Sequence, residues 1–264
     1  MNFFKNTALL TSLLSIVALG DEVANTTAAN ASILSVYKVE KFGHLVTAPS
    51  FSLGAPVGMV PGYGVIFAGL SGKTNSSDTD GALAVGMGFG DPLNSLGGAA
   101  TLAIGSIDPR DGGAFNRGTL NLTTGRHFAK QGLGVAVGVS NIDLWHDNDD
   151  NEFDPSFYGS ITKLLPNNIA PMILTAGFGN NVYSDSKSDE DLKSKIGVFG
   201  ALAVYLMPQL SLVADYTSGV TTAGVSVVPF PKLPVSLMAG ASDIFEYSDD
   251  KVSFIAGISA AYTF

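Results

Sequence analysis

Residues 252–264, Val-Ser-Phe-Ile-Ala-Gly-Ile-Ser-Ala-Ala-Tyr-Thr-Phe, separate into two faces when they are read two at a time. One face is an apolar row, made of Val252, Phe254, Ala256, Ile258, Ala260, Tyr262 and Phe264. The other face is smaller and more polar, made of Ser253, Ile255, Gly257, Ser259, Ala261 and Thr263. A period of two residues is that of a β-strand, so this stretch predicts a strand with a different solvent on each face.

The strand ends on two aromatic residues, Tyr262 and Phe264. A terminal Phe usually frays in water, whereas both rings fit the membrane–water interface of a barrel strand. This ending resembles the C-terminal signal of bacterial outer-membrane β-barrels, in which a terminal Phe and alternating apolar residues are read by the barrel-assembly machinery. The resemblance implies an outer-membrane location, contact with lipid and lipopolysaccharide, and an assembly role for Tyr262 and Phe264.

The other end of the chain indicates export. Lys5 precedes an apolar run over residues 7–19, and the small residues of Ala18-Leu19-Gly20 stand before Asp21. These features predict a cleaved secretory signal peptide over residues 1–20. The run is shorter than the ~20 residues that a membrane-spanning helix needs.

Residues 61–264 are regular, and we interpret them as an all-β, antiparallel, up-and-down transmembrane barrel. Apolar, glycine-rich segments of strand length recur, as expected for tilted strands that cross a bilayer. Twelve are predicted, with ten or fourteen as alternatives, over residues 62–71, 82–90, 98–107, 117–128, 132–142, 156–164, 171–183, 195–206, 210–218, 220–228, 234–244 and 252–264.

The connections between these segments alternate in kind. Short turns rich in Pro, Asn and Gly alternate with mostly longer acidic loops, apart from the tight Ser218-Gly219 connection. The loops at 72–81, 108–116, 143–155, 184–194 and 245–251 hold 17 of the 23 acidic residues. Short turns at one end and long loops at the other are typical of outer-membrane barrels.

Residues 21–60 do not follow this pattern. They include a small polar stretch over 21–30 and a Pro- and Gly-rich stretch over 50–60. Three interpretations stay open: a periplasmic extension, a plug inside the barrel, or an extra strand.

Composition excludes several classes of protein. The chain has no cysteine, which excludes thiol chemistry and cysteine-bound metals and fits a bacterial envelope protein better than a eukaryotic secreted one. Its formal charge of −9 argues against a nucleic-acid partner. We predict no cofactor.

The inward faces are small and mildly polar, which predicts a narrow lumen unless residues 21–60 fill it. Asp215, Asn121 and His127 fall on inward faces, where they are candidates for the selectivity of a pore. The acidic loop with Asp147, Asp149, Asp150 and Glu152 fails the calcium-loop pattern, because its sixth position is Glu152 in place of Gly. We therefore predict no metal site and interpret this loop as a solvated external one that attracts cations.

We therefore predict a passive, porin-like channel for small solutes or ions. The main alternative is a non-conducting structural or adhesive barrel with a filled lumen, and a component of polysaccharide or lipid export comes after it. Outer-membrane phospholipases are barrels with a Ser–His pair on the outer wall, but His127 is predicted to point inward. We therefore expect no enzymatic activity.

Overall fold

The computed structural model describes residues 39–41, 44–46, 49–74, 79–105, 115, 117–146, 154–165, 169–184, 196–230, 233, 235–247 and 251–264. The predicted signal peptide lies outside these residues, as do Asp147, Asp149, Asp150 and Glu152. Within the described ranges, no helix is long and apolar enough to cross a membrane.

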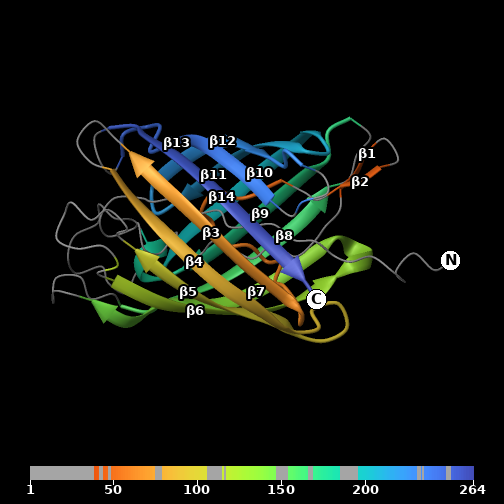
Figure 1. The fold of residues 1–264 in the computed structure, drawn as a ribbon, viewed down its shortest axis with the longest axis horizontal. Helices are drawn as coiled ribbons and strands as arrows, with labels where there is room; N and C mark the ends of the chain where they lie inside the picture. The colour runs from red at the N-terminus through yellow and green to blue at the C-terminus, as the bar shows by residue number, and fades with distance from the viewer. Residues whose placement is uncertain are drawn as a thin grey trace.

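Twelve antiparallel strands close into a barrel (Figure 1). Each strand pairs with the next along the chain, and β14 pairs with β3 to complete the circle. The strands are β3 (Val65–Thr74), β4 (Thr79–Gly90), β5 (Gly97–Gly105), β6 (Arg117–Phe128), β7 (Leu133–His146), β8 (Ser156–Leu165), β9 (Met172–Gly179), β10 (Gly197–Met207), β11 (Leu210–Thr217), β12 (Val220–Val227), β13 (Val235–Ser242) and β14 (Ser253–Thr263). The predicted fold and strand number are therefore confirmed.

Outside the barrel, β1 (Val39–Lys41) and β2 (His44–Val46) form a short antiparallel pair. Two single turns of 3-10 helix complete the described elements: η1 (Ala129–Gln131), between β6 and β7, and η3 (Asn181–Tyr183), after β9.

Two strand boundaries differ clearly from the prediction. β7 continues to His146 instead of residue 142, because it pairs with β6 as far as Arg117 and two bulges along the way each take up an extra residue. β9 ends at Gly179 instead of residue 183, because η3 then turns toward the lumen and buries Tyr183.

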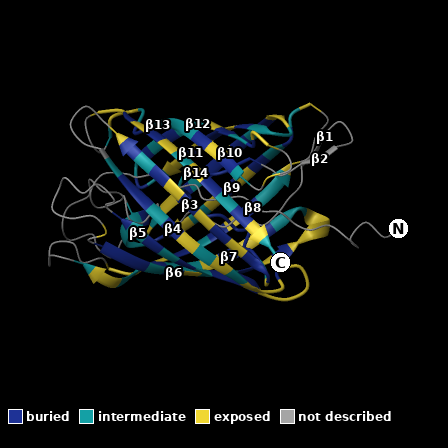
Figure 2. Cartoon of the chain, in the orientation of Figure 1, coloured by how far each residue is buried: buried dark blue, intermediate teal, exposed yellow. Residues whose placement is uncertain are grey.

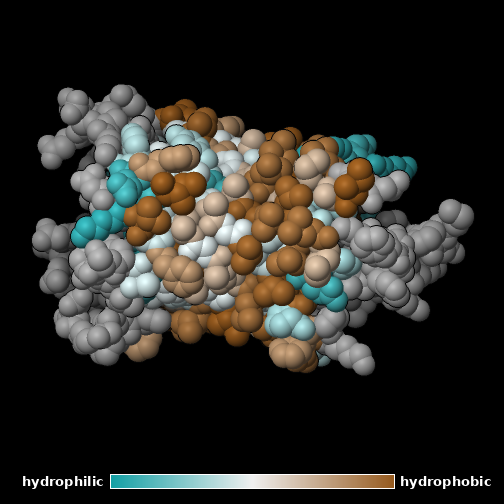
Figure 3. Space-filling model, turned by 90° about the horizontal axis from the view of Figure 1, so that it is seen from above, coloured by the Kyte–Doolittle hydropathy of each residue, from teal (hydrophilic) through white to brown (hydrophobic). Residues whose placement is uncertain are grey.

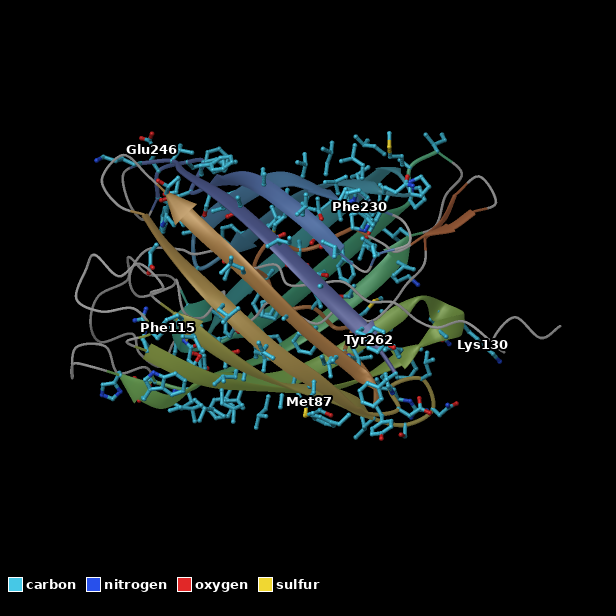
Figure 4. The ribbon with its side chains drawn as sticks, viewed as in Figure 1. Met87, Phe115, Lys130, Phe230, Glu246 and Tyr262 are labelled. Atoms are coloured by element: carbon cyan, nitrogen blue, oxygen red, sulfur yellow. The ribbon has the colours of Figure 1, made fainter. Side chains whose placement is uncertain are left out.

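The two ends of the barrel are distinct. We call the end with η1 and the tight β10–β11 connection the turn end, and the opposite end, with the β7–β8 and β9–β10 connections, the loop end. Lys130, in η1, and Glu246, after β13, mark these two ends in Figure 4. The exceptional Ser218-Gly219 connection is a two-residue hairpin turn at the loop end, with φ of 55° and 86°.

Exposure alternates along the strands, as the faces of the sequence predict (Figure 2). On β14, Phe254, Ile258 and Tyr262 are exposed, while Ile255 and Ser259 are buried. On β10, Val198 and Leu202 face outward and Tyr205 faces the lumen.

The outer surface is an apolar band between two groups of aromatic side chains. The middle carries exposed Leu, Val, Ile and Met, including Met87, which points outward in Figure 4. Exposed rings at the turn end are Tyr63, Phe89, Phe128, Phe230, Tyr262 and Phe264. Those at the loop end are Phe115, Trp145, Phe157, Phe178, Tyr216, Phe245 and Phe254. Figure 3 shows this apolar surface over the middle of one face. A closed barrel with such a band is a transmembrane β-barrel.

Candidate functional site: the occupied lumen

Residues 49–61, which we call the lumen segment, lie inside the barrel and are buried apart from the half-buried Gly54. Pro49 lies near the turn end, where its carbonyl accepts a hydrogen bond of 3.0 Å from the Tyr205 hydroxyl. The segment reaches Asp215 near the loop end of β11 and then returns to His127 at the turn end of β6. It thus forms a loop that enters and leaves the lumen at the turn end.

The tip of this loop is held by one carboxylate. Asp215 Oδ2 accepts hydrogen bonds from Ser52 Oγ at 2.9 Å and from the N–H groups of Leu53, Gly54 and Ala55 at 2.7, 2.7 and 2.9 Å. Successive N–H groups that converge on one oxygen form an anion-binding nest. Asp215 therefore fixes the turn of the lumen segment at a single wall position.

Other wall side chains accept three further N–H groups of the segment. Ser50 N donates to Ser226 Oγ at 2.9 Å, and Gly58 N donates to Thr162 Oγ1 at 2.8 Å. Val60 N donates to His127 Nε2 at 2.9 Å, so this ring nitrogen carries no proton and the imidazole is neutral. The wall thus satisfies backbone groups that would be costly to bury without a partner.

Apolar side chains pack the segment against the wall. Phe51, Leu53, Val57 and Met59 are each at most 2% exposed. They belong to one core cluster with the wall residues Ile173, Ala203, Tyr205, Val213, Val220, Met238 and Ile255. Burial of each such side chain stabilises the seated segment by roughly 1.5–3 kcal/mol.

Strand glycines allow the backbone of the segment to approach the wall closely. A Cβ at Gly134 would lie 2.5 Å from Gly58 O and 2.7 Å from Met59 Cγ. A Cβ at Gly88 would lie 2.9 Å from Pro61 Cβ. A side chain at either position would overlap the lumen segment in its observed place. These two glycines therefore belong to the wall surface against which the segment packs.

Three aromatic rings lie beside the tip of the segment. The Tyr183 ring lies 5.4 Å from that of Tyr158 and 5.2 Å from that of Phe199, and Ala55 belongs to the same cluster. Hydroxyl contacts fix two of the rings, Tyr158 to Thr123 Oγ1 at 2.6 Å and Tyr183 to Ser140 Oγ at 3.0 Å. The lumen is therefore filled at this level by wall and segment together.

The three lumen candidates of the sequence all face inward, but they do different things. Asp215 and His127 contact the lumen segment. Asn121 Oδ1 instead accepts the N–H of Asn141 at 2.9 Å, at the β7 bulge where Asn141 has a φ of 58°. The described hydrogen bonds of Asn121 therefore join it to other residues of the barrel wall and not to the lumen segment.

The two C-terminal candidates lie on the lipid side at the turn end. Tyr262 is exposed on β14 (Figure 4). Phe264 N donates to Gly64 O at 3.0 Å, and the Phe264 ring packs edge-on against Tyr63 with centroids 6.2 Å apart. The chain end is therefore attached to the start of β3, where the barrel closes.

No motif in the sequence marks Thr162, Ser226 and Tyr183 as residues of the site. Thr162 and Ser226 are recoverable in part from strand alternation, which places both on inward faces. Tyr183 falls in the strand predicted over residues 171–183, and no periodic signal separates it from that strand.

Comparison with known proteins found no matching family model and no matching curated protein. Among solved structures, the chain is similar to outer membrane phospholipase A from Escherichia coli, at 11% identity over 76% of this chain and 94% of that one, with a TM-score of 0.46. It is also similar to an outer membrane channel from Pseudomonas putida F1, at 11% identity over 78% and 97%, with a TM-score of 0.47. The outer membrane protein Omp33 of Acinetobacter baumannii matches at 12% identity over 76% and 98%, with a TM-score of 0.42.

These neighbours are bacterial outer-membrane β-barrels, and none of them assigns this chain to a specific family. The membrane-barrel character of the chain rests on its own strand pairing and lipid-facing surface.

Proposed function

We propose that this chain is a passive channel of the bacterial outer membrane for small solutes, and that residues 49–61 hold it closed. The observation that carries the proposal is a polar lumen wall, from which Thr162, Ser211 and Ser226 hydrogen-bond to the chain's own segment. Buried hydroxyls line the inner face on Thr101, Thr119, Ser160, Thr162, Thr175, Ser211, Thr222, Ser226, Ser236 and Ser259.

A wall used only for packing would be more stable with apolar residues, because a buried hydroxyl without a partner costs free energy. Within the described residues, the hydroxyls of Ser71, Ser160 and Ser253 are buried and make no hydrogen bond. Such a wall suits water and polar solutes, which supports a channel.

The apolar contacts of the lumen segment support a resting state that is closed. Withdrawal into water would expose Phe51, Leu53, Val57 and Met59, each at a cost of roughly 1.5–3 kcal/mol. Spontaneous opening is therefore rare, and the proposed channel differs from a constitutively open porin.

The same apolar seat favours the second candidate, a non-conducting structural or adhesive barrel with a permanently filled lumen. The two candidates differ in one property, namely whether displacement of the lumen segment opens a conducting path through the barrel.

We also infer that the protein has no enzymatic activity. The His127 Nε2 is occupied by Val60 N–H inside the lumen, which removes the position at which this imidazole would take a proton. His146 lies at the end of β7, where its Nδ1 contacts Asp143 Oδ2 at 2.6 Å. Its ring is about a quarter exposed there, and no serine contacts it in the described hydrogen bonds.

The remaining partners are proposals of the same kind. The apolar band and its rings would contact membrane lipid and lipopolysaccharide, and the β14 terminus would engage the assembly machinery during insertion. Short turns face the periplasm in such barrels, so the lumen segment would enter from that side.

Planar-bilayer conductance of the refolded full-length protein tests the proposal. Gly134→Ala places a Cβ against Gly58 O and destabilises the seated segment by about 1–3 kcal/mol, which raises the open population about 5- to 150-fold. Gly72→Ala is the matched control, since its Cβ would meet only Asp80 O at 3.5 Å. We expect conductance steps about 5- to 150-fold more often in Gly134→Ala than in Gly72→Ala. Silence of Gly134→Ala and of Gly88→Ala would support the non-conducting barrel instead.

A further inference from the structure

The carboxylate of Asp215 is bonded on one oxygen only. Its Oδ2 accepts four hydrogen bonds from the lumen segment, whereas its Oδ1 is buried and makes no hydrogen bond. Asp215 is only 5% exposed, and its register partners on β10 and β12 are Ala201 and Thr222. The described residues provide no ion pair for it.

A buried carboxylate normally requires a cation or several hydrogen-bond donors. Here the donors are three N–H groups of residues 53–55 and the Ser52 hydroxyl, which Asp215 shares with Ala55 O at 2.6 Å, and all of them come from the removable part of the structure. When the segment leaves, the wall would retain the charge of Asp215 and lose all four donors.

We propose that Asp215 is the solute-binding group of the channel, and that residues 52–55 occupy the place of a small organic cation with several N–H donors. This inference rests on the proposed channel function. An alkylguanidinium or primary alkylammonium ion would supply both the charge and the donors that the segment removes on opening.

The loop end of the barrel attracts such a cation. Seventeen of the 23 acidic residues belong to the sequence stretches 72–81, 108–116, 143–155, 184–194 and 245–251, and clefts rimmed by one sign of charge raise the local concentration of counter-ions. Asp215 stands two residues from the loop end of β11. The cation binds the open state selectively, because Asp215 is available only there, and so it shifts the population toward that state.

The test uses the full-length protein in planar bilayers with methylguanidinium chloride at millimolar concentration. Tetramethylammonium chloride is the control probe, because it carries the same charge and no N–H donor. We expect methylguanidinium, and not tetramethylammonium, to raise the frequency of opening of the native chain about tenfold.

Two variants locate the effect. Asp215→Asn keeps a carbonyl acceptor for the segment but removes the charge, so the response to methylguanidinium should disappear. Asp243→Asn alters another buried carboxylate, whose Oδ1 accepts Tyr247 N at 2.7 Å, and the response should persist.

An equal response in Asp215→Asn, or an equal response of the native chain to tetramethylammonium, would overturn the inference. Silence of the native chain with both probes, while Gly134→Ala conducts, would overturn the inference and leave the proposed channel intact. Silence of every variant under every condition would overturn both.

Discussion

At the scale of single residues, the acceptor at position 215 controls how firmly the segment is held. Asp215→Ala leaves three buried N–H groups without their acceptor, and each costs about 1–3 kcal/mol. We expect this variant to open far more often than the native chain in planar bilayers. Asp215→Asn retains an oxygen and should open less often than Asp215→Ala. Equal opening of the two would contradict the role of the acceptor.

Asn121 acts on the wall instead of the segment. Asn121→Leu removes the acceptor of Asn141 N–H at the β7 bulge, which should destabilise the barrel by about 1–3 kcal/mol. The measurement is the temperature or urea concentration at which the folded band is lost on a gel. Asn121→Asp retains an oxygen for the same N–H and should lie closer to the native protein. An unchanged unfolding midpoint for Asn121→Leu would contradict a stabilising role for this hydrogen bond.

At the scale of elements, β14 closes the barrel through its last residue. Deletion of Phe264 removes the hydrogen bond to Gly64 O and the ring contact with Tyr63. We expect less protein assembled in the membrane, with a smaller change in the conductance of each assembled molecule. Tyr63→Ala removes the same ring contact but keeps the C-terminal residue, and it should assemble normally. Normal assembly of the deletion would contradict the role of Phe264.

The strands were predictable because their two faces meet different solvents. β6 has the predicted bounds, and Leu212 and Tyr216 on β11 alternate with Ser211 and Asp215 as expected. Bilayer thickness fixes strand length, so periodicity and length reinforce each other.

The lumen segment was not predictable in the same way. Its backbone bonds to wall side chains such as Ser226, Thr162 and His127, which belong to three different strands. A segment that is stabilised by side chains distant from it in the sequence needs no regular alternation of apolar and polar residues. Likewise, the sequence does not distinguish a glycine that allows a strand to bend from one that, like Gly134, allows another segment to pack closely against the strand.

At the scale of the whole molecule, closure of twelve strands leaves no free edge, so the barrel should resist detergent until it is heated. We expect unheated protein to migrate faster on a gel than heated protein. Seating of the segment adds to this resistance, so Gly134→Ala should convert at a lower temperature than Gly72→Ala. Identical migration before and after heating would contradict the barrel itself.

The most direct test of the account locks the segment in place within a destabilised barrel. The hydrogen bond of 2.9 Å from Ser50 N to Ser226 Oγ makes these two positions neighbours, so we choose them for a pair of cysteines, and the chain has no other thiol to compete. The variant combines Gly134→Ala with Ser50→Cys and Ser226→Cys, and its conductance is measured before and after reduction. We predict silence while the disulfide is intact and conductance steps once it is reduced. Equal conductance of the oxidised and the reduced variant, with the disulfide shown to form, would contradict a channel that is closed by the lumen segment.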